Sequence, residues 1–168
     1  KGGIGGAALC CGDLKVGAIA AVNCVGDVLE NGKIIAGTLH SGSDASFADS
    51  EKIILSRYAA ETDFFSGKPS DASSGNTILV CIITNARLDK VGATRLAAHG
   101  QNGIARCVRP SHSLYDGDTV FAMCNGTVAA SFDAAAILAA RAVEAAIIDA
   151  VKNRTKPLYP PVFAVCKN

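Results

Sequence analysis

A chain of 168 residues is long enough to form one domain with a substantial buried core. Its residues are 49% hydrophobic and only 18% charged, which predicts a compact, soluble protein and excludes a disordered one. With a net charge of +1, no cluster of Lys and Arg, and no Trp, the sequence lacks the basic patches and stacking surfaces typical of nucleic-acid binding. No apolar segment reaches the roughly 20 residues of a membrane span, so we expect no membrane partner.

The first third of the chain predicts mainly strands. The apolar run from Leu14 to Val25 predicts a fully buried strand. Asn31-Gly32 predicts a hairpin turn between the short apolar segments at residues 27–29 and 33–37. Residues 49–62 suit a helix or an ordered excursion, and the polar segment that follows ends in a linker rich in Gly, Ser and Pro at residues 66–76.

The rest of the chain alternates strands and helices. We expect a central strand at residues 77–84 and then a helix at residues 88–106 that Asp89 caps. A second buried strand follows at residues 119–123. The chain then continues with a helix at residues 132–151, capped by Ser131, and an extended tail at residues 157–166. Three glycines weaken the first helix unless another backbone approaches it there: Gly92, Gly100 and Gly103. Buried strands that alternate with largely apolar helices predict a layered α/β architecture with helices outside the sheets.

The cysteines and glycines point to no metal and no cofactor. The seven cysteines lie mostly within apolar runs and include no Cys-x-x-Cys pair, which argues against a zinc site. Buried thiols suit a reducing cytoplasm, where we expect the protein to reside. The Gly-rich start at residues 1–6 matches neither of the glycine-rich nucleotide-binding motifs, and no strand precedes it.

The Asn76-Thr77 pair stands where the polar linker stops and the central strand begins. A threonine hydroxyl is a poor nucleophile at neutral pH without an adjacent base, and a free α-amine, whose reference pKa is roughly 7.7 to 8, is such a base. One hypothesis is therefore that the Asn76–Thr77 bond is cut and that Thr77 becomes an N-terminal nucleophile. On these residues alone, the simpler interpretation is that Asn76-Thr77 opens a buried strand.

Three other side chains could converge on Thr77. The amide of Asn23, at the end of the first strand, could donate to the oxyanion that forms when a carbonyl is attacked, although an Asn also suits a turn. Asp116 and Asp118 share one face if their segment is extended, and they could orient and exchange protons with a threonine amine and hydroxyl. Asp-Gly-Asp is also an ordinary turn before a strand, and it offers too few oxygen ligands for a cation loop.

A Ser-His-Asp or Cys-His arrangement is a different way to make a nucleophile. Of the three histidines, His112 lies in a turn after Pro110 with a serine on each side. No G-x-S-x-G motif accompanies it, and a single histidine in a loop usually only forms a hydrogen bond. His112 is therefore the weaker candidate.

Several motifs occur in an order that resembles one family. They are Lys1-Gly2-Gly3-Ile4-Gly5 and the segments at residues 16–18, 21–23, 26–27, 76–88, 103–106, 109–112 and 116–122. This series resembles the L-aminopeptidase/D-esterase family, which also contains β-peptidyl aminopeptidases and nylon-oligomer hydrolases. The resemblance covers nearly the whole chain except residues 40–75.

The resemblance implies an αββα four-layer sandwich of the N-terminal-nucleophile-hydrolase type, in a precursor that cleaves itself before a Ser or Thr. Thr77 then matches the nucleophile, Asn23 the oxyanion-stabilising asparagine, and Asp116 and Asp118 an acidic pair that some members place beside the nucleophile. The family's members carry a further N-terminal portion, so residues 1–168 are expected to be the C-terminal part of a single domain. In it, residues 1–76 precede the cleavage site.

The expected function is a self-processing aminopeptidase or amidohydrolase that removes N-terminal residues from short peptides, amino-acid amides or esters. Its expected partners are that substrate, the N-terminal portion of the same precursor and further copies of itself. The apolar helix at residues 132–151 suits subunit contacts and equally suits burial against a missing N-terminal layer. Two alternatives stay open. One is an N-terminal-threonine acyltransferase of the ornithine acetyltransferase type, and the other is a non-catalytic assembly or binding domain that retains the fold.

Overall fold

The computed structural model describes residues 2–40, 46–60 and 75–153. Four strands form the main sheet in the order β1-β2-β5-β7. Neighbouring strands are antiparallel except for the parallel pair β5 and β7. The four strands are β1 (Gly3–Cys11), β2 (Leu14–Asn23), β5 (Thr77–Ala86) and β7 (Thr119–Val128).

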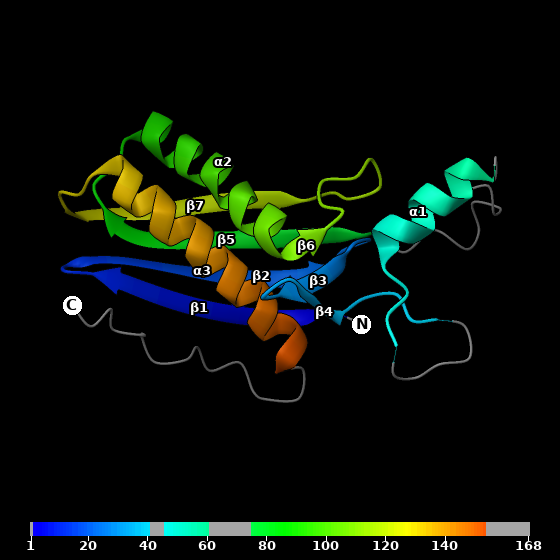
Figure 1. The fold of residues 1–168 in the computed structure, drawn as a ribbon. Coiled ribbons are helices and arrows are strands. Elements are labelled where there is room, and N and C mark those ends of the chain that lie inside the picture. The colour runs from blue at the N-terminus through cyan, green and yellow to red at the C-terminus, as the bar shows by residue number, and fades with distance from the viewer. Residues whose placement is uncertain (1, 41–45, 61–74, 154–168) are drawn as a thin grey trace.

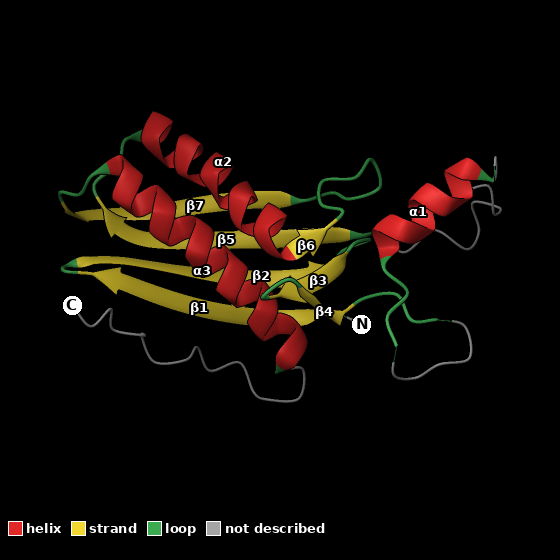
Figure 2. Ribbon diagram, in the orientation of Figure 1, coloured by secondary structure: helices red, strands yellow, loops and turns green. Residues whose placement is uncertain are grey.

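A smaller sheet and three helices complete the described part of the chain. The small sheet has the order β4-β3-β6, formed by Lys33–Ala36, Asp27–Glu30 and Val108–Arg109. The helices are α1 (Ser50–Ala59), α2 (Lys90–Cys107) and α3 (Phe132–Lys152). Figure 1 shows α2 and α3 side by side across one face of the main sheet, and Figure 2 shows α1 standing apart from it. No helix among the described residues has the length and hydrophobicity needed to cross a bilayer.

The core lies between the main sheet and the helices α2 and α3. In β2 and β5 every second residue is buried and faces the helices, while the residues between them face the other way. The prediction of fully buried strands is therefore wrong for the described residues, because helices cover one face of the sheet only. The other predicted helices and strands of the described residues are found, although β7 continues past residue 123 to Val128. Of the two alternatives for residues 49–62, the structure has the helix, α1.

The described residues leave the opposite, apolar face of the main sheet uncovered. Large side chains on β2, β5 and β7 are between 48% and 61% exposed there: Ile19, Leu79, Ile83, Phe121 and Met123. A shallow hollow of about 490 Å³ lies on the same face. A large exposed apolar patch of this kind typically marks a surface that contacts something else.

Helix α2 approaches α3 closely because glycine allows it. A Cβ atom built at Gly103 would lie 2.5 Å from the carbonyl oxygen of Ala140 in α3. One built at Gly100 would lie 2.7 Å from Ile82 in the sheet below. The approach of another backbone, which the sequence left open for three glycines, is thus found at Gly103. At Gly100 the neighbour is a side chain, and at Gly92 the nearest atoms belong to Leu88 and Asp89 of the same turn.

Some of the predictions for turns and helix caps agree with the structure, and others do not. Asn31 and Gly32 both have positive φ, at 50° and 76°, as the predicted hairpin turn between β3 and β4 requires. Asp89 caps α2 by accepting a hydrogen bond from the Gly92 amide at 2.7 Å. Ser131 stands at the N-cap of α3, but its side chain forms no capping bond. The Gly-rich start forms strand β1, which the sequence pattern did not predict, and the tail at residues 157–166 lies outside the described residues.

A buried aspartate fixes α1 to the small sheet. Asp27 in β3 is 2% exposed, and its Oδ1 accepts hydrogen bonds from the Thr38 amide at 3.0 Å and the Ser50 hydroxyl at 2.8 Å. Its Oδ2 accepts from the Ser50 amide at 2.6 Å. The Asp27 carboxylate therefore holds the first residue of α1, the helix that leads toward the linker before Thr77.

Replacing Asp27 with Ala should destabilise the protein by roughly 3 kcal/mol, because three donors, the two of Ser50 buried and the Thr38 amide partly buried, lose their acceptor at once. Asp27→Asn, which keeps one acceptor oxygen, should be milder. The free energy of unfolding in urea, compared with Asp13→Asn at an exposed turn position, measures the effect. Equal stability of Asp27→Ala and Asp13→Asn would contradict this role.

Candidate active site

Residues from three distant parts of the chain meet at the start of β5. Thr77 is the first residue of that strand, and it lies directly opposite Asn23, the last residue of β2. Asn76 forms an isolated parallel bridge with Asp116, just before β7. The predicted site residues Asn23, Asn76, Thr77 and Asp116 are thus brought together by strand pairing.

The Thr77 hydroxyl lies close to the bond that it is expected to cut. Its Oγ donates to the carbonyl oxygen of Asn76 at 2.5 Å, and the residue is only partly buried. The Gly117 amide donates to the same oxygen at 3.0 Å. Thr77 points to the face of the sheet that none of the described helices covers, since its neighbour Ile78 is fully buried beneath α2 and α3.

The two aspartates make different contacts. Asp116 Oδ1 accepts from the Val25 amide at 3.0 Å, and its Oδ2 accepts from the Ser113 hydroxyl at 2.6 Å. Both oxygens of Asp116 are thus engaged, and they connect the turn before β7 to the turn after β2. The Asp116 carboxylate therefore holds two loops of the site together.

Asp118 lies against the first residues of β5. Its Oδ1 accepts from the Ile78 amide at 2.9 Å, and its side chain is 4% exposed. Its Oδ2 is buried and has no hydrogen-bond partner among the described residues. Asp118 therefore presents one unused acceptor oxygen beside the peptide group that joins Thr77 and Ile78.

His112 is a neighbour of Asp118 and not part of a separate triad. Its Nδ1 lies 3.2 Å from Asp118 Oδ2, although the pair does not have the geometry of a hydrogen bond. The hydroxyl of Ser113 donates to Asp116. The sequence singled out His112 only as an alternative nucleophile system, and its place beside Asp118 depends on the folded loop, where His112 has a φ of 54°.

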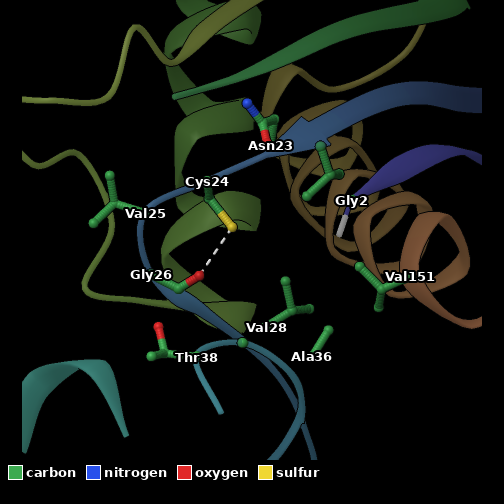
Figure 3. A pocket seen from close by; sticks show the side chains of 11 residues that line it. Gly2, Asn23, Cys24, Val25, Gly26, Val28, Ala36, Thr38 and Val151 are labelled. Carbon is green, nitrogen blue, oxygen red and sulfur yellow. Dashed lines mark hydrogen bonds between the residues drawn. The ribbon is translucent and has the colours of Figure 1, made fainter. Parts of the chain in front are cut away.

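Asn23 lies one peptide unit away from the expected oxyanion. Its Nδ2 donates to the carbonyl oxygen of Gly75 at 3.2 Å, in the residue before Asn76. Next to it, a hollow of about 210 Å³ opens between the end of β2, the small sheet and the end of α3 (Figure 3). Asn23 therefore stands between the Asn76–Thr77 bond and a cavity.

Cys24 also lines this hollow, but it is no nucleophile. Its thiol donates to the Gly26 carbonyl at 3.0 Å, as the dashed line in Figure 3 shows. Burial, together with the negative charge of Asp116, raises the pKa of Cys24 to about 12. The thiol is thus neutral at physiological pH, and a neutral thiol attacks carbonyl carbons poorly. In the part of the chain that the structure describes, no group of three or more His, Cys, Asp or Glu side chains could hold a metal ion.

Solved structures identify the fold. An L-aminopeptidase D-Ala-esterase/amidase from Ochrobactrum anthropi, described as a variant of the N-terminal-nucleophile (Ntn) hydrolase fold, matches with a TM-score of 0.56 at 19% identity, over 89% of this chain and 40% of that one. A β-aminopeptidase from Burkholderia sp. matches with a TM-score of 0.53 at 25% identity, over 89% and 41%. The described residues thus form part of an Ntn-hydrolase fold, as the resemblance implied.

Sequence comparison then gives the family. The profile of Peptidase family S58 matches residues 1–156. An uncharacterized aminopeptidase of Mycobacterium leprae (strain TN) is 34% identical over 132 residues, which are 78% of this chain and 34% of that protein. A 6-aminohexanoate-oligomer endohydrolase of Agromyces sp. (strain KY5R) is 29% identical over 113 residues, or 67% and 30%. The chain belongs to peptidase family S58, and it spans about a third of the length of these two relatives.

Iodoacetamide at pH 8 should modify exposed Cys11 much faster than Cys24. With a pKa of about 12, only about one Cys24 thiol in ten thousand is ionised at that pH, and the thiolate is the reactive form. Mass spectrometry of peptides from the labelled, folded protein measures both rates. Labelling of Cys24 at the rate of Cys11 would show that Cys24 is neither buried nor neutral.

Proposed function

We propose that this chain is the nucleophile-bearing part of a self-processing aminopeptidase or amidohydrolase, with Thr77 as the nucleophile. The observation that supports it best is the 2.5 Å approach of the Thr77 hydroxyl to the Asn76 carbonyl oxygen at the open end of β5. Membership of a peptidase family and relatives named as aminopeptidase, esterase/amidase and oligomer endohydrolase support hydrolysis of an acyl bond.

Maturation would free the α-amine of Thr77. The hydroxyl attacks the Asn76 carbonyl carbon, the peptide bond opens to an ester, and water then hydrolyses the ester. The new amine lies on the same residue as the hydroxyl and can take its proton. Asp118 Oδ2, which accepts no hydrogen bond among the described residues and lies 3.2 Å from His112 Nδ1, is the buried acceptor that would hold this amine and exchange protons with it.

Turnover would reuse the same groups. The Thr77 hydroxyl attacks the carbonyl of a short peptide, an amino-acid amide or an ester, and the Asn23 amide, released from Gly75 once the linker leaves, donates to the oxyanion. The amine returns the proton to the leaving group, and water hydrolyses the acyl-enzyme. An acyltransferase would use the same steps with an amine in place of water, so trapping of the acyl group by added amines separates the two activities.

The site also needs a second layer. Thr77 and Asn23 lie at one end of the apolar sheet face that the described residues leave uncovered. We therefore propose that a further portion of the precursor packs on this face and closes the site. The chain spans only about a third of the length of the two relatives, so these relatives have further residues that could form such a layer. Self-association of the whole protein stays a prediction.

Thr77→Ala should leave the complete natural polypeptide uncut and inactive, because the attacking oxygen is gone. Thr77→Ser should still split, since serine keeps the hydroxyl, and Thr127→Ala at the exposed far end of β7 should split like the parent. Intact-mass measurement detects the two products, one ending at Asn76 and one starting at Thr77. A Thr77→Ala protein that still splits there would refute the assignment.

Asp118→Asn should slow splitting by about a hundredfold or more, because the amide keeps the contact with the Ile78 amide and loses the proton acceptor. Asp133→Asn, at an exposed position in the first turn of α3, is the matched control and should split at the parent rate. The time course of precursor loss by mass spectrometry measures both. Equal rates in the two variants would exclude Asp118 from the chemistry.

A further inference from the structure

We propose that the main-chain amide of Gly117 is the donor that stabilises the oxyanion when the Asn76–Thr77 bond breaks. This inference rests on the proposed function, because it names the group that makes the same self-cleavage possible. It starts from a single contact: the Gly117 N–H donates at 3.0 Å to the Asn76 carbonyl oxygen, the oxygen that the Thr77 hydroxyl also contacts.

The negative charge of the cleavage reaction develops on that oxygen. When Thr77 Oγ bonds to the Asn76 carbonyl carbon, the π electrons of the carbonyl move onto its oxygen, and the hydroxyl proton passes to Asp118 Oδ2. The tetrahedral centre then collapses, the carbon–nitrogen bond breaks, and the nitrogen takes that proton as a free amine. Water adds to the resulting ester through a second oxyanion on the same oxygen and yields the Asn76 carboxylate and the Thr77 hydroxyl. The Gly117 N–H points at this oxygen before either step begins.

The donor is held in place from both sides. Asp118, the next residue, is bonded to the Ile78 amide at 2.9 Å, and Asp116, the preceding residue, is bonded to the Val25 amide at 3.0 Å. The Gly117 amide therefore cannot turn away without breaking contacts to β5 and to the turn after β2. A donor fixed in advance stabilises a developing charge without any reorganisation during the reaction.

The contact with Thr77 explains why residue 117 is a glycine. Gly117 is not in the left-handed region of backbone conformations, so its φ does not require glycine. A Cβ atom built on it, however, would lie 2.9 Å from Thr77 Oγ, closer than such contacts occur. A side chain at position 117 would push the hydroxyl away from the Asn76 carbonyl. A glycine at position 117 therefore supplies the N–H donor and also leaves room for the Thr77 hydroxyl.

This assignment separates the roles of Gly117 and Asn23. In the uncut chain the Asn23 amide is occupied by the Gly75 carbonyl, while Gly117 is bonded to the scissile carbonyl itself. Gly117 is thus the donor for maturation, and Asn23 becomes available to a substrate after Gly75 and Asn76 have left.

The test removes the N–H while every side chain stays unchanged. Replacing Gly117 by glycolic acid, introduced by nonsense suppression in the complete natural polypeptide, turns the amide into an ester without adding an atom beyond the exchanged oxygen. Loss of one oxyanion donor typically lowers a rate by about 10² to 10³, and we expect the splitting at Asn76–Thr77 to slow by this factor. The matched control is glycolic acid at Gly92, whose N–H donates to Asp89 at the opposite end of the sheet and which should leave the rate unchanged.

A second variant tests the steric half of the inference. Gly117→Ala keeps the N–H but places a methyl group against Thr77 Oγ, so splitting should also slow, while the urea midpoint of unfolding should change no more than in Gly92→Ala. If the parent splits and the glycolate variant at position 117 splits at the same rate, the inference is wrong and the proposed function stands. A parent polypeptide that never splits overturns both.

Discussion

The register of β5 between β2 and β7 is the constraint on which the site depends. Ile78, Val80 and Ile82 face the helices and are at most 1% exposed, so the residues between them face the opposite way. Burial of each such side chain contributes roughly 1.5 to 3 kcal/mol. A slip of one residue would expose all three and bury the Thr77 hydroxyl beneath α2 and α3. The packing of the core thus selects the face on which Thr77, the proposed nucleophile, lies.

The features predictable from the sequence are those with a local cause. The turn at Asn31-Gly32 and the cap formed by Asp89 depend only on residues that are close in the sequence. Thr77 stands where the sequence changes from polar to apolar. The meeting of Asn23, Thr77 and Asp116 is different, because it depends on strand pairing between distant segments. The residue types suggested that these side chains could converge, but on the residues alone the simpler interpretations were favoured, and the resemblance to a family changed that. Asp27 was invisible for the same reason: beside Gly26 it suits an ordinary turn, and its three donors come from elsewhere in the chain.

The uncovered sheet face explains why one strand prediction failed. Continuous apolar runs such as residues 14–25 are typical of strands with both faces buried, and in the described residues only one face is packed. The sequence of β2 is therefore suited to an environment that these residues do not supply by themselves. A second sheet against Ile19, Leu79 and Phe121, as in an αββα sandwich, would bury the other face and would also shield the Thr77 hydroxyl from bulk water.

Asp116, Gly117 and Asp118 work as one turn because their contacts lead to different strands. The two carboxylates were expected to share a face and a task, yet Asp116 is bonded to the turn after β2 and Asp118 to the first amide of β5. The ends of those same strands carry Asn23 and Thr77. The turn therefore couples the positions of Asn23, Thr77 and the Gly117 amide. Under the proposed function, the Gly117 amide, Thr77 Oγ and Asp118 Oδ2 would keep their mutual placement after cleavage. The same polar groups would then serve a first reaction on the protein's own backbone and later ones on a substrate.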